Sequence, residues 1–306
     1  MSGVQPAAAM PLNTAPPQAA VPSEPGRSGK GFLQRALRHR SFMTGGVLTL
    51  FVISAALLST IWTPWPAYEI DVAHKLNPPS ATHWLGTDVL GRDIVSLLLV
   101  GARSSIVVGV IAVGIGLLVG ASLGLIAAAR KGWVEELIMR LGDFTFAFPA
   151  LLSAIMLAAV AGAGMVTSIA AIGIFQIPVF LRITRGSANA IWAREFVLAA
   201  RAAGKGKFRI TLEHVLPNIL SILIVQATIQ FALAILAEAA LSYLGLGTQP
   251  PQPSWGRMLN DAQSLLFQSP SLAVYPGLAI ATAVLGLNLL GDGLRDLFDP
   301  RLSRER

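Results

Sequence analysis

The sequence predicts an all-α integral membrane protein with six transmembrane helices. Hydrophobic residues make up 54% of the 306 residues and charged residues only 13%, whereas an average soluble domain carries roughly 25% charged residues. Apolar stretches of about the length that a bilayer requires recur along the chain. This composition excludes a disordered, collagen-like or disulfide-stapled chain, and the absence of cysteine excludes thiol redox chemistry.

The first apolar stretch, residues 45–62, is expected to be an uncleaved membrane span. Residues 1–30 are rich in Pro, Ala, Gly and Ser, and a disordered cytoplasmic tail is expected there. The basic residues Arg35, Arg38 and Arg40 separate this tail from the apolar stretch. A cleaved signal peptide is not expected, because the stretch begins too far from the N-terminus and Trp62-Thr-Pro is not a small-residue cleavage site.

Five further stretches are long and apolar enough for membrane helices, at 104–129, 137–160, 166–183, 217–241 and 272–290. The region 93–129 is too long for one span. A short interfacial helix is therefore expected before the second span, with the break near Gly101-Ala-Arg103.

The basic residues predict the orientation of these spans. Nineteen of the 23 Lys and Arg residues lie in the two tails and in the two connections expected on the same side. Basic residues accumulate in cytoplasmic loops, so both termini are expected in the cytoplasm. The net charge of +7 is then explained by orientation, and nucleic-acid binding is not predicted.

The chain divides by composition into four parts. The tail 1–30 is followed by 31–93, which holds the basic segment, the first span and the first outer loop. A five-helix core is expected at 94–292, with a cytoplasmic helix at about 191–209 and an outer loop at about 245–271. A second cytoplasmic tail is expected at 293–306.

Residue patterns typical of catalysis or of cofactor binding do not occur in the sequence. The four histidines lack metal-ligand spacing. Gly204-Lys-Gly-Lys207 resembles a phosphate loop, but it lacks the first glycine, the following Ser or Thr, and a preceding strand. No metal, nucleotide or cofactor is therefore expected in this chain.

Two features inside the spans each leave two interpretations open. Gly116, Gly120 and Gly124 form a stripe of small residues, which packs either within this chain or against another membrane subunit. Glu238 lies near the outer end of the fifth span, where its carboxylate either bonds to the outer loop or lines a translocation path. Asp143 is expected to be a helix-end charge near the interface.

Residues 191–218 predict a short amphipathic helix between two spans. The spacing places Trp192, Phe196, Ala199, Ala200 and Ala203 on one helix face. A glycine at position 204 can end the helix, and a proline at position 217 can begin the next span. The Ala-rich face favours a protein groove over the alternative of a membrane surface.

This segment resembles the cytoplasmic coupling motif of binding-protein-dependent ABC importers. Ala199, Ala200, Gly204, Leu216 and Pro217 match the motif, while position 198 has leucine for the usual glutamate and position 214 histidine for isoleucine. The stretches 196–204 (FVLAARAAG) and 213–218 (EHVLPN) are similar to the version found in the peptide/nickel branch.

Three other blocks agree with this resemblance. The stretch 83–93 (HWLGTDVLGRD) resembles the outer-loop signature of the C-type dipeptide/oligopeptide permease. The stretches 238–247 and 253–257 resemble its second outer loop, and 288–301 resembles its C-terminal end. The similarity covers about residues 30–303, in order.

The resemblance implies a type I ABC importer permease: a non-catalytic channel subunit for peptides or peptide-like solutes, including nickel chelates, in the bacterial inner membrane. Its implied partners are a B-type permease, two ATPase subunits that bind ATP and Mg, and an extracytoplasmic binding protein. The residues implied in coupling to the ATPase are Glu195, Phe196, Ala199, Ala200, Arg201, Ala203, Gly204, His214 and Pro217. Those implied in the outer loops or the translocation path are Gly86, Asp88, Arg92, Asp93, Glu238 and Trp255.

Two rival functions make different demands on the sequence. A secondary transporter needs a coupling-ion site and usually an internal repeat, yet the spans offer a single carboxylate candidate and no clear repeat. A membrane-embedded hydrolase needs a nucleophile and a base, and histidine is absent from the expected spans.

Overall fold

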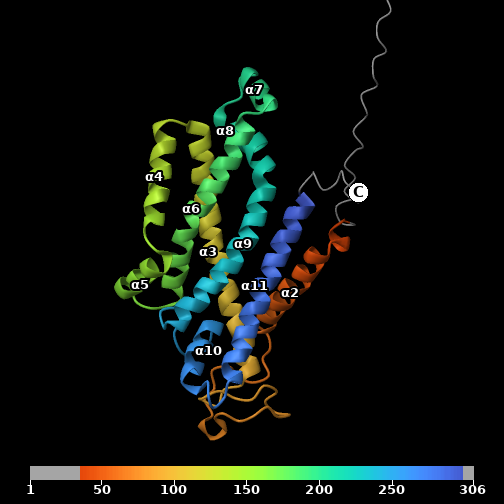
Figure 1. The fold of residues 1–306 in the computed structure, drawn as a ribbon, viewed down its shortest axis with the longest axis vertical. Coiled ribbons are helices and arrows are strands. Elements are labelled where there is room, and N and C mark those ends of the chain that lie inside the picture. The colour runs from red at the N-terminus through yellow and green to blue at the C-terminus, as the bar shows by residue number, and fades with distance from the viewer. Residues whose placement is uncertain (1–34, 299–306) are drawn as a thin grey trace, which may run out of the picture.

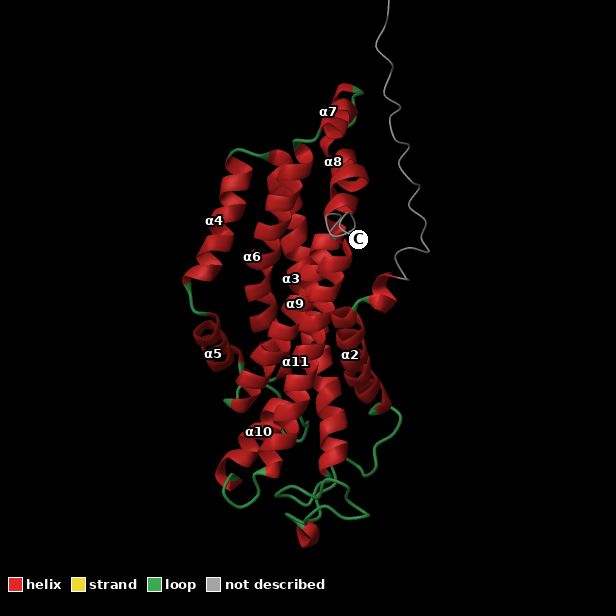
Figure 2. Cartoon of the chain, turned by 45° about the vertical axis from the view of Figure 1, so that its right-hand side comes forward, coloured by secondary structure: helices red, strands yellow, loops and turns green. Residues whose placement is uncertain are grey.

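The structure is a computed structural model that describes residues 35–298. Within that range it is helical, and the only strand-like pairing is an isolated bridge between Thr87 and Asp93 (Figure 2). The all-α prediction is confirmed. The tail expected at 1–30 lies outside the described residues, as do residues 299–306 of the expected C-terminal tail. The helices named below are α2 (Arg40–Leu58), α3 (Ile94–Arg130), α4 (Trp133–Ala147), α5 (Ala150–Ala161), α6 (Met165–Trp192), α7 (Glu195–Ala202), α8 (Lys207–Ile210), the π-helical η2 (Thr211–Val215), α9 (Leu216–Tyr243), α10 (Trp255–Ala262) and α11 (Ser271–Phe298), with 3₁₀ turns η1 (Val72–His74) and η3 (Gln263–Leu265).

The long helices form an elongated bundle. Helix α3 packs along α6, α2 packs along α11, and α9 contacts α3, α6 and α11. Helix α7 lies at one end of the bundle, while α10 and the loop between α2 and α3 lie at the opposite end (Figure 1). We call these the coupling end and the outer end. The expected coupling segment and the two expected outer loops therefore lie at opposite ends.

Within residues 35–298, five helices are long and apolar enough to cross a membrane, and the bent pair α4–α5 can supply a sixth span. The prediction of one continuous helix at 137–160 is wrong, because α4 and α5 meet at an angle of 84°. Pro149 explains the break. Proline disfavours the helical conformation in the residue before it, and Phe148 is extended, with φ −99° and ψ 136°.

The structure of α3 contradicts a second prediction, that of a break in the helix near Gly101. It runs without a break for 37 residues, about 55 Å at 1.5 Å per residue, so no separate interfacial helix precedes the span. Gly101 does not interrupt the helix but allows a close contact. A Cβ atom at this position would lie 2.8 Å from Cδ1 of Trp255.

The region from α7 to α9 differs from the expected coupling helix at 191–209. Residue 192 ends α6, α7 has only eight residues, and residues 207–209 already belong to α8. Pro217 lies in the first turn of α9, as expected, but α8, η2 and α9 form one continuous 37-residue helix, so the long helix begins before it. The wider π turn of η2 precedes Pro217 and accommodates its ring and its missing N–H.

The glycine stripe of α3 packs against α6 of the same chain. A Cβ atom on Gly116 would lie 2.5 Å from Cβ of Gln176, and one on Gly120 would collide with the carbonyl oxygen of Ile177. Gly124 approaches Thr184 in the same way. These three glycines therefore bring two long helices into backbone contact.

The two ends of the described chain lie side by side. His39 Nε2 lies 3.2 Å from a carboxylate oxygen of Asp296, and Gly293 packs against Phe42. Helix α11 continues to Phe298, so the first residues of the tail expected at 293–306 are helical.

Candidate functional site

The exposed apolar side chains of α7 and α8 mark the coupling end. Phe196 is 47% exposed, Leu198 49% and Phe208 78%, whereas Val197 is fully buried against the bundle. The prediction that residues 192, 196, 199, 200 and 203 share one helix face is wrong in part. Trp192 is buried on α6 and Ala200 packs against the core, while Phe196 faces outward. The other exposed residues of the expected coupling set are Glu195, Ala199, Arg201, Ala203, Gly204 and Pro217.

Gly204 ends α7 in a left-handed conformation, with φ +80°. The Lys205 N–H donates to the Ala200 carbonyl at 3.1 Å, and the Gly204 N–H donates to the Arg201 carbonyl at 2.9 Å. These bonds satisfy the last carbonyls of the helix. A Cβ at position 204 would have no atom of residues 35–298 within 4 Å, so among these residues only the backbone conformation favours glycine.

Lys205, Glu213 and His214 connect the loop after α7 to η2, and we call them the coupling joint. Lys205 Nζ lies 2.7 Å from Glu213 Oε2 and donates to His214 Nε2 at 3.2 Å. The rings of Phe196 and His214 meet edge to face, with centroids 6.2 Å apart. The side chains of α7 and η2 are therefore in direct contact.

Sequence reasoning identified His214 in this joint but missed Lys205 and Glu213. The pairing of Glu213 with Arg209 has the helical i, i+4 spacing and could have been predicted. The pairing with Lys205 crosses the turn at Gly204, so its geometry depends on how the chain reverses there.

Glu238 is completely buried near the outer end of α9. Its carboxylate accepts hydrogen bonds from Ser105 Oγ at 3.0 Å and from Ser242 Oγ at 2.7 Å, and Thr248 Oγ1 lies 3.5 Å away. Ser105 belongs to α3 and Thr248 to the following loop. These contacts favour the structural interpretation of Glu238, as a bond between two helices and the outer loop.

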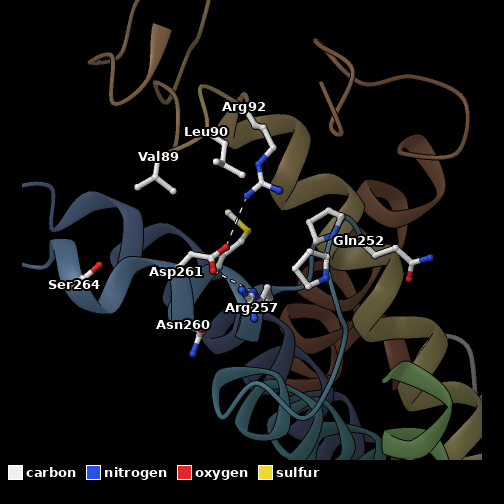
Figure 3. A pocket seen from close by; sticks show the side chains of 11 residues that line it. Val89, Leu90, Arg92, Gln252, Arg257, Asn260, Asp261 and Ser264 are labelled. Carbon is white, nitrogen blue, oxygen red and sulfur yellow. Dashed lines mark ion pairs between the residues drawn. The ribbon is translucent and has the colours of Figure 1, made fainter. Parts of the chain in front are cut away.

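An ion-pair network joins the two outer loops. Arg92 lies 2.6 Å from Asp88 and 3.8 Å from Asp261, which pairs with Arg257 at 3.0 Å. Figure 3 shows Arg92 and Arg257 approaching Asp261 from two sides, at the wall of a pocket of about 410 Å³. Burial raises the pKa of Asp261, and the positive charges of Arg257 and Arg92 oppose this shift.

The remaining outer-loop residues hold the loops in place. Asp93 caps α3 by accepting the Ser96 N–H at 2.8 Å, and it also bonds to His83 Nδ1 at 3.0 Å. Gly86 has φ +82° in the same loop. Trp255 begins α10, and its indole N–H donates to the Leu98 carbonyl of α3 at 3.1 Å.

A cavity of about 340 Å³ lies between α5, α6 and α9, and we call it the membrane cavity. Its two polar lining residues are Gln176 of α6 and Gln230 of α9. Sequence reasoning missed both. None of the expected translocation-path residues lines this cavity. Within residues 35–298 no cluster of His, Asp and Glu side chains could hold a metal ion.

Comparisons with known proteins agree on one family. The protein family described as binding-protein-dependent transport system inner membrane component matches residues 120–304. The glutathione transport system permease protein GsiD of Pectobacterium atrosepticum is 41% identical over 272 residues, which cover 89% of this chain and 90% of that protein. GsiD of Escherichia coli and of Shigella boydii are each 42% identical over the same lengths and shares.

A solved structure supports the same fold. A chain from the MetNI methionine ABC transporter, solved in inward-facing conformations, matches with a TM-score of 0.57 and 15% identity. The match covers 66% of this chain and 97% of that chain, and at this identity it concerns the fold alone. Together with the relatives at 41–42% identity, these matches confirm the resemblance found in the sequence. The chain belongs to the family of binding-protein-dependent transport system inner membrane components.

Proposed function

We propose that this chain is the transmembrane channel subunit of an ATP-driven, binding-protein-dependent importer of peptides or peptide-like solutes. The relatives at 41–42% identity are glutathione transport permeases, and glutathione is a tripeptide. The structural observation that supports the proposal most is the exposed apolar surface of α7 and α8 at the coupling end, beside a joint to the long α9 helix. Exposed apolar patches of this kind mark surfaces where another protein binds.

The proposed assembly contains five polypeptide chains. This chain pairs with a B-type permease in the bilayer. Two cytoplasmic ATPase subunits hold ATP and Mg, and an extracytoplasmic binding protein delivers the solute to the loops of the outer end. This chain itself performs no chemistry on the solute and holds no cofactor.

In the proposed mechanism, α7 transmits the movement of the ATPase. ATP closes the two ATPase subunits, and the one that holds α7 moves it. Because Lys205 and Phe196 contact η2 through Glu213 and His214, the movement passes into α9. The spans then alternate between inward-open and outward-open arrangements. ATP and the loaded binding protein drive the cycle because each stabilises a different arrangement.

The coupling end is proposed to face the cytoplasm of a bacterial cell, with the chain in the inner membrane and both termini inside. The distribution of Lys and Arg supports this orientation. The chain has no cysteine, so a single introduced cysteine is the only thiol of this chain that a labelling reagent can modify. Ser80→Cys and Gln252→Cys should react with an impermeant reagent in spheroplasts, and Ala202→Cys only after lysis. The reverse pattern would contradict the orientation.

Uptake by the reconstituted complex tests the function. Proteoliposomes with the partner permease, the ATPase subunits and the loaded binding protein should accumulate intact glutathione only when ATP is supplied. An ATPase that binds but does not hydrolyse ATP provides the control. ATP-independent uptake driven by an ion gradient would favour the secondary transporter, and recovery of cleaved solute would favour the hydrolase.

A further inference from the structure

The membrane cavity combines apolar walls with two buried amide side chains. Eleven of its lining residues are Ala, Leu, Ile, Val or Phe, and the other two are Gln176 and Gln230. These glutamines are 5% and 6% exposed. A buried amide in a membrane span is costly unless its donors and acceptors are paired, so the pairing of each amide indicates what it does.

The Gln176 amide is only partly paired within the described residues. Its Nε2 donates to the backbone carbonyl of Gln230 at 3.4 Å, a long hydrogen bond. Its Oε1 is buried and has no partner in the part of the chain that the structure describes. Gln230 contributes its backbone carbonyl to this bond, and its side chain lines the cavity. Among the described residues the Gln176 acceptor is therefore unpaired but covered, and it becomes accessible to a solute when the long bond to Gln230 opens.

The chemistry of the wall fits a peptide bond. A glutamine amide offers two N–H donors and one carbonyl acceptor, and a peptide bond offers one of each. No charged residue lines the cavity, so it offers no ion pair to the termini or to charged side chains of a solute. A volume of about 340 Å³ falls in the usual range for small-molecule sites.

We propose that Gln176 and Gln230 form a binding site for a peptide bond of the solute in the membrane cavity between α5, α6 and α9. The site recognises the solute backbone through amide hydrogen bonds and accepts different side chains against apolar walls. The incoming peptide bond takes the place of the long bond between the two helices. This proposal deepens the proposed function and rests on it.

The competing explanation is that Gln176 only joins α6 to α9. The substitution Gln230→Met separates the two explanations, because it removes the side-chain amide and leaves the backbone carbonyl that accepts the Gln176 bond. Gln226→Met is the matched control. Gln226 lies one turn earlier on the same helix and does not line the cavity.

The test measures ATP-driven uptake of trialanine and of N-methylated trialanine by the reconstituted complex with saturating loaded binding protein. Gln230→Met should slow trialanine uptake about tenfold, the effect of losing one hydrogen bond that is made in a desolvated site. It should also lower the ratio of trialanine to N-methylated trialanine uptake, while the thermal stability of the complex stays unchanged. The control Gln226→Met should match the wild type in rate and ratio.

Two results would overturn the site. One is a Gln230→Met complex with the wild-type ratio of the two solutes, whatever its rate, since the amide would then make no contact with the peptide bond. The other is the same loss of rate and ratio in Gln226→Met. Absence of ATP-driven uptake of both trialanine and glutathione in the wild type is a different failure, which would contradict the proposed function itself.

Discussion

The outer and coupling ends of the bundle hold their carboxylates in different ways. At the outer end, Glu238 is fully buried and accepts hydrogen bonds from the hydroxyl groups of Ser105 and Ser242. At the coupling end, the side chains of Glu213 and Lys205 are 37% and 32% exposed, and water reaches both. A buried carboxylate that loses its partners leaves uncompensated polar groups, whereas an exposed pair exchanges its partners with water.

This difference indicates different mechanical roles for the two ends. Leaving a buried donor or acceptor without its partner costs about 1–3 kcal/mol, while an exposed ion pair contributes about 0–1 kcal/mol. The outer end is therefore fixed by contacts that are costly to break. The coupling end is held by contacts that can rearrange during each transport cycle. The predictions below follow in order of their expected effect on the free energy of unfolding.

Glu238→Leu should have the largest effect. It leaves the hydroxyl groups of Ser105 and Ser242 buried without their acceptor, and we expect the free energy of unfolding to fall by about 3 kcal/mol or more. Glu238→Gln keeps an acceptor oxygen and should lose about 1 kcal/mol. Thermal unfolding of the purified protein in detergent measures both.

Glu136→Leu is the matched control for Glu238→Leu. Glu136 pairs with Arg140, and the two side chains are 63% and 75% exposed, so the unfolding temperature should stay close to that of the wild type. Equal losses in Glu238→Leu and Glu136→Leu would show that burial of the carboxylate does not stabilise the outer end.

Gly204→Trp should reduce stability much less but abolish uptake. The left-handed conformation, with φ +80°, costs a non-glycine residue about 1–2 kcal/mol, and no atom in the described part of the chain lies within 4 Å of an added Cβ. Gly204→Asn tolerates the same conformation and should retain uptake. If the bulky variant assembles with the ATPase subunits and transports at the wild-type rate, this turn does not contact the ATPase.

Lys205→Met tests whether the coupling joint transmits movement. It removes the link across the turn to Glu213 and His214, with a stability change below about 1 kcal/mol. Solute transported per ATP hydrolysed should fall. Arg209→Met removes the other partner of Glu213, but that pair lies within one continuous helix, so this ratio should remain normal. A similar fall in both variants would assign the effect to the charge of Glu213 alone.

Apolar stretches were sufficient to predict the class of fold, because a membrane span is defined by length and hydropathy. They did not predict the bend after α4. Phe148-Pro149 is visible in the sequence, yet prolines also occur inside unbroken helices here, at Pro178 and Pro276. Whether a proline breaks a helix depends on how the neighbouring helices pack around it. Gly101 gives the opposite case, since it accommodates Trp255 without interrupting α3.

The sites were harder to predict than the fold. The motif residues of α7 could be located because they lie close together along the chain. Gln176 and Gln230 are 54 residues apart, and each alone is an ordinary polar residue in an apolar stretch. The two residues meet at one cavity only because α6 packs beside α9 in the folded chain. The hydroxyl partners of Glu238 come from α3, α9 and the following loop for the same reason.

The smallest expected effect concerns the pH dependence of the outer end. Burial raises the pKa of Asp261, and the charge of Asp88 adds to this shift, while Arg257 and Arg92 oppose it. The folded protein therefore binds a proton at Asp261 more readily than the unfolded chain does. This group's contribution to stability is greatest in acid and is lost as the pH rises through the raised pKa. The pKa of Asp71 is shifted in the opposite direction, because its hydrogen bond with His74 lowers it. Unfolding temperatures measured between about pH 7 and pH 4 should therefore fall more steeply on acidification in Asp261→Asn than in the wild type. The contribution of Asp71 is lost only below about pH 4, so Asp71→Asn should follow the wild-type curve above that pH. If Asp261→Asn follows the wild-type curve throughout, Asp261 titrates alike in the folded and unfolded chains, and its burial between Arg92 and Arg257 has no part in fixing the outer end.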